Sequence, residues 1–173
     1  MGSRQFSLLP ELKRQYEHGG QLLKGKRKSR RPFNRKKPLH LVFRSDEAKG
    51  RFSFLMPQNR KKVINLLKRY SCVCQIRIYD SAINSNHLHL LVGALDKRSL
   101  IRFLRSFPGA LAMSITGSKK ASPLTKRFWT VRVYSRIVEW GRGFGIVKDY
   151  ILQNTLESLG LIPYQPRKNR APE

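Results

Sequence analysis

Acidic residues are rare in this chain. Only 10 of its 173 residues are Asp or Glu, against 36 Lys and Arg, so the formal net charge is +26 at neutral pH. A charge of that size favours a polyanionic partner, and nucleic acid is the commonest one. Residues 1–37 carry +10 of it, which leaves +16 on residues 38–173. We therefore expect a basic folded surface that follows phosphates, and not only a basic tail.

Cysteine and long apolar segments are also scarce. The only cysteines are Cys72 and Cys74. A disulfide between residues so close together would be strained, and no further cysteine exists to complete a zinc site with them. No apolar run approaches the ~18 residues that a membrane span needs, and no secretion signal is recognisable. These features predict a reduced, cytoplasmic compartment and no membrane partner.

Segments whose apolar residues recur with the period of a strand are followed along the chain by segments with the period of a helix. We expect strands near residues 39–44, 73–79, 87–93 and 128–138. We expect helices from Pro57, from Asp96 or Ser99 to Ile115, and over 146–159, with Pro108-Gly109 kinking or splitting the second. This is an α+β order, β-α-β-β-α-β and one more helix. It predicts the ferredoxin-like split βαβ plan, an antiparallel sheet with two helices on one face.

The N-terminal residues have a different character. Leu8, Leu9, Leu12 and Tyr16 predict a weak helix that ends at Gly19-Gly20. Nine of the fourteen residues 24–37 are Lys or Arg, and such a run is normally disordered when free. It is either an arm that lies along a phosphate backbone or a solvated tail. We expect a basic N-terminal arm over residues 1–37, a folded domain over 38–163 and a polar tail over 164–173.

Two histidines, His87 and His89, lie in the strand expected over residues 87–93. Residues two apart on a strand point to the same face, and their Cα atoms lie ~7 Å apart. Both imidazoles can then hold one divalent cation that keeps open positions. A pair of this kind is also compatible with two histidines that merely satisfy a sheet face, so the pair alone decides nothing.

The last expected helix carries Tyr150 and Asn154, which are four residues apart and share a face. Asn154 can offer its side-chain carbonyl as the oxygen ligand that two imidazoles leave open. Gln153 is the fallback ligand, although it points ~100° away from Asn154 around the helix. The three glycines within residues 141–145 are either a hinge for this helix or an ordinary loop.

In combination, these motifs resemble the HUH nucleases of single-stranded DNA, and more narrowly the REP-associated tyrosine transposases. Residues 86–92 match the family pattern Asn-His-hydrophobic-His-Leu-Leu-Val. Residues 38–44 are similar to its first strand, and Phe128-Trp129, residues 150–154 and Gly160-Leu161 to its C-terminal half. The resemblance covers roughly residues 30–163, and the histidine and tyrosine motifs are its most specific parts.

The chain departs from the family pattern at three places. Thr155 stands where the family often has Pro, and Gly160-Leu161 follows Asn154 at a spacing one residue longer than expected. The turn before the histidines reads Asn84-Ser85-Asn86 instead of Met-Pro-Asn. The first two departures concern the end of the last helix and leave the active site intact.

The resemblance implies an HUH nuclease/transposase domain over residues 38–163. It implies a metal-dependent single-stranded DNA endonuclease and transposase that nicks and rejoins hairpin-associated DNA through a 5′-phosphotyrosine. Tyr150 would be the nucleophile, and His87, His89 and Asn154 would hold Mg²⁺ or Mn²⁺. A monomer acting in cis is favoured over a dimer that swaps the tyrosine helix. The expected location is the bacterial cytoplasm, in association with the nucleoid.

DNA binding is expected on the basic surface. The split βαβ plan makes the first and third strands neighbours, so His40 and Arg44 are expected near His87 and His89, either at substrate phosphate, as a second shell, or as a structural pair. Phe128 and Trp129 are candidates for base stacking or for the core. The basic candidates are Lys26, Arg27, Lys28, Arg30, Arg31, Arg35, Lys36, Lys37, Lys119, Lys120, Lys126, Arg127, Arg132 and Arg136.

Three other functions fit parts of the sequence. A non-catalytic, RRM-like RNA- or DNA-binding protein would share the charge and the sheet plan. It would also need aromatic residues on the central strands, where the chain offers only Phe43. A replication initiator or relaxase would share the site, but usually carries further domains. A domesticated transposase would still bind and cleave palindromic repeats without mobilising itself.

Overall fold

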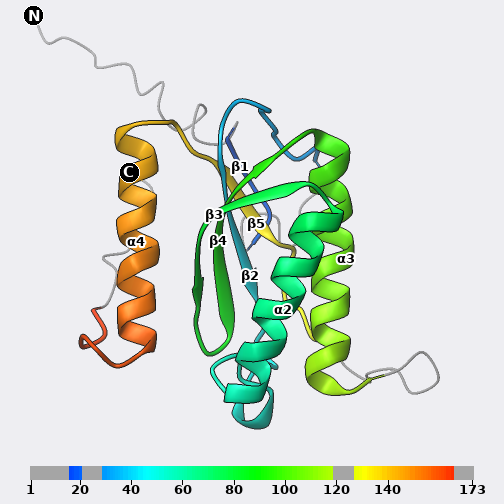
Figure 1. The fold of residues 1–173 in the computed structure, drawn as a ribbon, viewed down its shortest axis with the longest axis vertical. Helices are drawn as coiled ribbons and strands as arrows, with labels where there is room; N and C mark the ends of the chain where they lie inside the picture. Colours follow the sequence, from blue (N-terminus) through cyan, green and yellow to red (C-terminus); the bar gives the residue numbers. More distant parts are fainter. Residues whose placement is uncertain (1–15, 21–28, 119–126, 166–173) are drawn as a thin grey trace, which may run out of the picture.

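A five-stranded antiparallel sheet separates one helix from two others (Figure 1). The computed structural model describes residues 16–20, 29–118 and 127–165. The strands are β1 (Glu17–His18), β2 (Leu39–Arg44), β3 (Ile76–Ile83), β4 (His87–Ala94) and β5 (Tyr134–Ile137). The helices are α2 (Pro57–Val73), α3 (Lys97–Thr116) and α4 (Arg142–Ser158), with a short 3₁₀ helix, η2, at Gly50–Phe52.

The strand order is β1-β5-β2-β4-β3. Without β1, this is the order of the split βαβ plan, in which the first and third strands, β2 and β4, are central neighbours. The helices α2 and α3 cover one face of the sheet and α4 covers the other (Figure 1). The predicted α+β fold with an additional C-terminal helix is therefore confirmed.

Alternation along β2 and β4 produces the two faces. Leu39, Leu41 and Phe43 are fully buried in the main core, where Phe43 meets Phe103 and Phe107 of α3 edge to face. The intervening residues of both strands point to the opposite face, where α4 lies. The core thus fixes which side chains of these two strands are presented to α4.

Three boundaries differ from the prediction. Helix α2 continues to Val73, so β3 begins only at Ile76 and runs on to Ile83, with an irregularity between Ile78 and Asp80. Strand β5 is limited to Tyr134–Ile137, because Phe128 and Trp129 turn into the core beside Phe54 instead of joining the sheet.

The proline of α3 and the glycines before α4 lie inside or next to longer helices than the sequence predicted. Helix α3 is not split at Pro108, because that residue removes one backbone donor while the apolar residues on both sides stay packed in the core. The indole of Trp129 donates to the carbonyl of Pro108 (2.9 Å). Helix α4 begins at Arg142, so two of the three expected hinge glycines lie in its first turn and only Gly141 precedes it.

The N-terminal residues contribute to the sheet. Glu17 and His18 form β1, which pairs with β5, where the apolar pattern had predicted the end of a helix. Of the rest of that predicted helix, the structure describes only Tyr16, which is helical, and the residues before it lie outside the described ranges. Arg31 joins the segment before β2 to β5, since its guanidinium donates to the carbonyl of Val133 (2.8 Å) and to the hydroxyl of Ser135. The division of the chain at residue 37 stays a prediction.

Among the helices that the structure describes, none combines the length and the apolar content needed to cross a bilayer.

Candidate active site

His87 and His89 share the face of β4 that looks toward α4. Their ring centroids lie 4.9 Å apart with the planes nearly perpendicular. The pairing with β2 puts Arg44 opposite His87 and Val42 opposite His89. His89 is buried, whereas His87 is partly exposed at the start of the strand.

Two asparagines of the preceding turn hold the ring of His87. Nδ1 lies 2.8 Å from the amide oxygen of Asn86, and Nε2 lies 3.0 Å from the amide nitrogen of Asn84. An amide oxygen only accepts and an amide nitrogen only donates. The proton of His87 is therefore on Nδ1, and the lone pair of its ring is on Nε2. Burial, together with the nearby charge of Arg44, lowers the pKa of His87 to about 4, so the ring is neutral.

His40 holds the ring of His89 in the same manner. Nε2 of His40 lies 3.1 Å from Nδ1 of His89, and the two rings are stacked with centroids 5.3 Å apart. Burial and the charge of Arg136 lower the pKa of His40 to about 4, so this ring is neutral as well. When Nδ1 of His89 donates and His40 accepts, the lone pair of His89 is on Nε2, as it is in His87.

Helix α4 brings Tyr150 against these histidines. The Tyr150 ring meets His89 edge to face, with centroids 5.2 Å apart, and meets His40 at 6.0 Å. Ile151 of the same helix packs on Ala82 and Leu91 and so fixes α4 on the sheet. The C-terminal end of α4 and the turn between β3 and β4 lie at the same end of the molecule (Figure 1). Asn154 lies one turn beyond Tyr150 on the same helix.

The side chain of Asn154 is buried and oriented. Its amide nitrogen donates to the carbonyl of Tyr150 (2.6 Å), so its amide oxygen is the atom left to accept a hydrogen bond or bind a cation. Gln153, the fallback ligand, is directed elsewhere, since its amide nitrogen donates to Glu157 (3.1 Å). Of these two side-chain amides, that of Asn154 contacts Tyr150, through the backbone carbonyl of the tyrosine.

These residues fit a divalent cation. A ligating histidine usually donates its other ring nitrogen to an oxygen or another acceptor, and this fixes the ring and its tautomer. The amide oxygen of Asn86 is that acceptor for His87, and Nε2 of His40 is placed to be the acceptor for His89. Within residues 16–20, 29–118 and 127–165, no group of three His, Cys, Asp or Glu side chains could hold a metal ion. The candidate donors are of another kind, namely the imidazoles of His87 and His89 and the amide oxygen of Asn154.

Two arginines flank the histidines on the same face. Arg44 lies opposite His87, and Arg136 of β5 lies opposite His40. Both side chains are more than half exposed, and each has a loose ion pair with a carboxylate, Asp46 (3.6 Å) and Glu17 (3.7 Å). Positive charge therefore lies at both ends of the row of histidines.

The remaining basic candidates are distributed unevenly. Arg30, Arg35, Lys36, Arg127 and Arg132 are exposed, and Lys37 pairs with Glu139 at 2.6 Å. Arg31 is instead partly buried in its contacts with β5, and burial, with the charge of Arg132, lowers its pKa to about 10. The predicted DNA contacts Lys26, Arg27, Lys28, Lys119, Lys120 and Lys126 lie outside the described residues.

Several residues at the site or in the core received no role, or an open one, from the sequence. Asn84 and Asn86 hold His87, and the signal for Asn86 was its place in the histidine motif itself. Phe128 is buried in the core, so its ring is not available to stack on bases, and Trp129 is partly buried and packed against the same core. Phe43 is also buried, so β2 presents no aromatic residue to α4.

Two solved structures are similar to this chain in fold. A REP-associated tyrosine transposase bound to a REP hairpin has a similar structure over 76% of this chain and 73% of its own, with 14% identity and a TM-score of 0.52. A candidate transposase from Deinococcus radiodurans R1 covers 74% of this chain and 98% of its own, with 15% identity and a TM-score of 0.46. No curated protein sequence matches significantly.

The likeness to the first structure shows a shared fold. The family comparison goes further, because the model described as "Transposase IS200 like" matches residues 35–154, more than half of the chain. That range begins before β2 and ends at Asn154, so it includes both histidines and the tyrosine. The chain belongs to the IS200-like transposase family.

Proposed function

We propose that this protein nicks and rejoins single-stranded DNA through a covalent bond between Tyr150 and a 5′-phosphate. The observation that supports this most directly is the contact of the Tyr150 ring with His89, with Asn154 one helical turn away. A phenol and an amide oxygen on α4 and two imidazoles on the sheet face below it are the groups that such a reaction needs.

His87, His89 and Asn154 would hold a divalent cation, Mg²⁺ or Mn²⁺, through two Nε2 atoms and one amide oxygen. The Asn84 amide, which donates to Nε2 of His87 in this structure, would give up that contact to the cation. When bound, the cation supplies the positive charge that stabilises the phosphate as charge develops on it. Asn86 and His40 keep the two rings in the ligating tautomer. Arg44 and Arg136 would bind DNA phosphates on either side of the reacting one, since they flank the row of histidines.

Tyr150 would then attack phosphorus in line with the leaving oxygen. The tyrosine loses its hydroxyl proton and forms the bond to phosphorus, while the bond from phosphorus to the 3′ oxygen breaks and that oxygen takes up a proton. The phosphotyrosine retains the energy of the phosphodiester. Attack by a 3′-hydroxyl reverses the step and rejoins the strand, or joins a new one, without ATP.

The substrate would be a hairpin with flanking single-stranded DNA. The net charge of +26 supports a polyanion, and the REP-associated transposase of similar fold is bound to a REP hairpin. Tyr150 contacts the histidines of its own chain, which supports action in cis by a monomer.

The test is the formation of a covalent adduct. The protein is incubated with Mn²⁺ and single-stranded hairpin oligonucleotides from its own genome, and adducts that survive denaturing electrophoresis are counted. We expect an adduct with the wild type and none with Tyr150→Phe. Tyr164→Phe is the matched control, because Tyr164 is 73% exposed and outside the site. An adduct with Tyr150→Phe, or none with the wild type on any hairpin, would overturn the proposal.

A further inference from the structure

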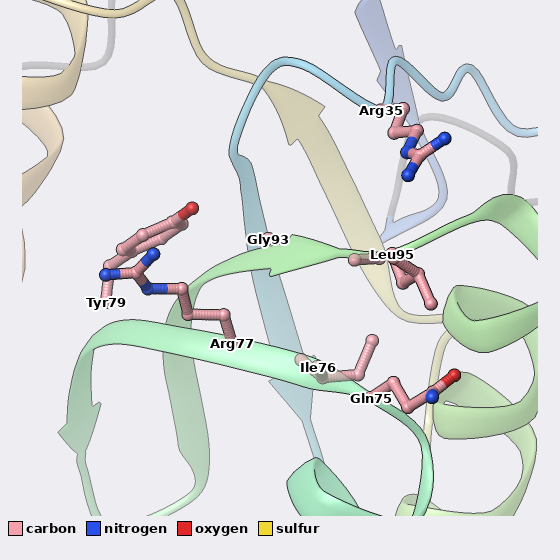
Figure 2. A pocket seen from close by; sticks show the side chains of 8 residues that line it. Arg35, Gln75, Ile76, Arg77, Tyr79, Gly93 and Leu95 are labelled. Carbon is pink, nitrogen blue, oxygen red and sulfur yellow. The ribbon is translucent and has the colours of Figure 1, made fainter.

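A hollow lies on the sheet beyond the histidines. It has a volume of about 490 Å³, within the range of small-ligand sites, and lies over the ends of β3 and β4 (Figure 2). It is lined by Arg35, Gln75, Ile76, Arg77, Tyr79, Gly93, Ala94 and Leu95.

The hollow is on the same side of the sheet as the proposed active site. His87, His89 and Gly93 are odd-numbered residues of β4 and so share a face. Gly93 is four residues beyond His89, which places it ~13 Å further along the strand. Arg77 lies opposite Gly93 on β3.

The lining carries two guanidinium groups and no carboxylate. Both Arg35 and Arg77 are exposed, and among the described residues neither makes an ion pair. Figure 2 draws the two guanidinium groups on opposite sides of the hollow, so the space between them has a positive potential that favours an anion. The charge of the hollow therefore fits a phosphate group.

Aromatic rings lie beside these charges. The guanidinium of Arg77 lies over the ring of Tyr79, 5.3 Å from its centroid, and Trp140 and Phe144 meet the edges of that ring at 5.6 Å. Trp140 is 51% exposed. A planar guanidinium and an exposed indole are surfaces on which nucleic-acid bases stack.

Gly93 gives the hollow its floor. A Cβ atom at this position would lie 2.8 Å from the hydroxyl oxygen of Tyr79. A glycine inside a strand often marks a place where another group approaches the backbone closely. Here the absence of a side chain lets Tyr79 lie flat over β4 and keeps the space beside it open.

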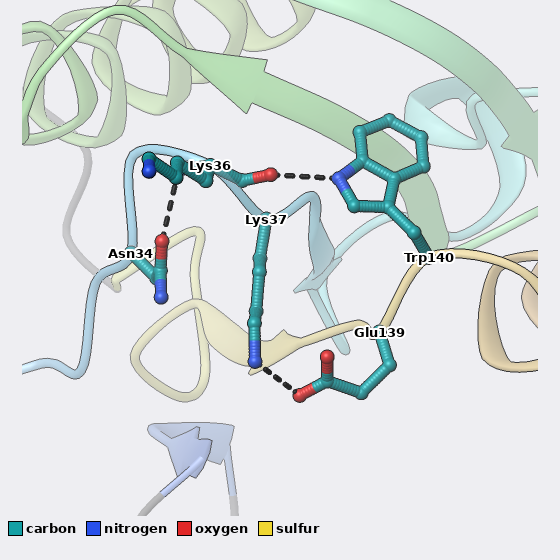
Figure 3. A network of polar contacts seen from close by, with 5 residues as sticks. All are labelled: Asn34, Lys36, Lys37, Glu139 and Trp140. Atoms are coloured by element: carbon teal, nitrogen blue, oxygen red, sulfur yellow. Dashed lines mark hydrogen bonds and ion pairs between the residues drawn. The ribbon is translucent and has the colours of Figure 1, made fainter.

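The position of Arg35 is held by contacts to the segment before α4 (Figure 3). The indole of Trp140 donates to the carbonyl of Lys36 (2.7 Å), and the Lys37 ammonium pairs with Glu139 (2.6 Å). The side chain of Asn34 accepts from the amide of Lys36 and tightens the same turn. The turn that carries Arg35 is thus bound to Trp140, which itself contacts Tyr79.

Gln75 adds a polar group at a strained backbone position. Its φ is 54°, the left-handed region, and it follows the C-cap of α2, where glycine is normally preferred. A glycine there would cost less, yet the chain has a residue whose amide side chain lines the hollow. An amide offers both donors and an acceptor to the edge of a base.

We propose that this hollow binds one nucleotide of the single strand that flanks the cleavage site. Arg35 holds its phosphate, and the guanidinium of Arg77, which lies over Tyr79, and the indole of Trp140 are the surfaces for its base. The proposal rests on the function proposed above. At ~3.4 Å per stacked nucleotide, ~13 Å places this phosphate within about four nucleotides of the one that Tyr150 attacks.

The test measures binding without chemistry. In a Tyr150→Phe background, the affinity for a hairpin with a single-stranded flank is measured by fluorescence anisotropy over a range of salt concentrations. Neutral methylphosphonates replace the linkages one at a time. We expect one flanking linkage, within about four nucleotides of the cleavage position, whose neutralisation weakens binding about tenfold and lowers the salt slope by about 0.7.

The arginine variants connect that linkage to the hollow. In Arg35→Gln/Arg77→Gln, the unmodified DNA should bind at least about tenfold more weakly, and the sensitive linkage should lose its effect. Arg69→Gln is the matched control, because Arg69 also lies over a tyrosine, Tyr70, at 5.9 Å and is outside the hollow. Thermal unfolding checks that all variants are folded.

Two outcomes would overturn the proposal. In the first, the double variant binds like Arg69→Gln. In the second, the sensitive linkages lie in the hairpin stem, which would mean that the hollow faces duplex DNA. Both are compatible with a normal covalent adduct in the otherwise wild-type chain. Failure of the hollow is therefore distinguishable from failure of the proposed function, which would abolish the adduct itself.

Discussion

Nε2 of His40 lies 3.1 Å from Nδ1 of His89, so the tautomers of a β2 histidine and a β4 histidine are linked, and His89 has its lone pair on Nε2 when its Nδ1 donates to His40. Both rings are buried, and Tyr150 contacts both. His40 is thus a positioning residue between the proposed ligand His89 and the proposed nucleophile.

Replacing His40 should weaken metal binding while the fold is retained. We expect His40→Ala to lower the affinity for Mn²⁺, and the rate of adduct formation, by about 10–100-fold, because Nδ1 of His89 loses its acceptor. Mn²⁺ binding is measured by electron paramagnetic resonance without DNA. His40→Gln should recover part of the loss, since its amide oxygen can accept. An unchanged Mn²⁺ affinity in a folded His40→Ala would show that His40 only fills space.

The two neighbouring amides of α4 should behave differently. Asn154→Ala should reduce Mn²⁺ affinity and adduct formation by at least about tenfold, because it removes a buried amide oxygen at the site. Gln153→Ala should change both by less than about twofold, since the Gln153 amide is directed to Glu157. The same metal titration and adduct assay distinguish them. A larger effect at Gln153 would indicate that Gln153, and not Asn154, is the third ligand.

The correctly predicted parts of this fold are the segments in which apolar residues recur at the regular spacing of a strand or a helix. Leu39, Leu41 and Phe43 alternate with His40 and Arg44, so the strand and its buried face followed from spacing, and the order of the elements then placed His40 and Arg44 near His87 and His89. Strand β1 has two residues, Glu17 and His18, and two residues have no period. Its existence depends on the partner β5, which local sequence does not encode.

Predictions from local composition were wrong where the tertiary contacts of a residue override the tendency of its residue type. Phe128 and Trp129 extend an apolar alternation, but the aromatic rings of Phe43 and Phe54 draw them out of the ladder and into the core. Arg31 lies in a basic run that suggests a solvated arm, yet its guanidinium bonds to β5. In both cases a tertiary partner decides the outcome.

Arg31 should therefore contribute to stability, unlike its neighbour. Arg31→Ala leaves the Val133 carbonyl and the buried Ser135 hydroxyl without their donor, and should lower the free energy of unfolding by about 1–3 kcal/mol. Arg30→Ala removes the same charge from an exposed side chain and should change it by less than about 0.5 kcal/mol. Urea denaturation gives both values, and equal values would mean that Arg31 does not hold the segment to the sheet.

Two glycines with left-handed backbones should tolerate alanine to different degrees. Gly19 has a φ of 88°, and an added Cβ would lie 2.1 Å from the carbonyl oxygen of Val133 on the next segment. Gly117 has a φ of 72° with nothing within 4 Å of its Cβ position. Gly117→Ala thus reports the backbone cost alone, about 1–2 kcal/mol, whereas Gly19→Ala also pushes β1 away from β5.

Hydrogen exchange makes this difference specific to the β1 end of the sheet. The amide of Gly20 donates to the carbonyl of Arg132 (2.8 Å), so its exchange reports whether the chain after β1 stays docked. We expect Gly19→Ala to accelerate exchange at Gly20 at least about tenfold and Gly117→Ala to leave it unchanged. If Gly20 exchanges as slowly in Gly19→Ala as in the wild type, the clash is relieved locally, and β1 is held by more than the close approach at Gly19.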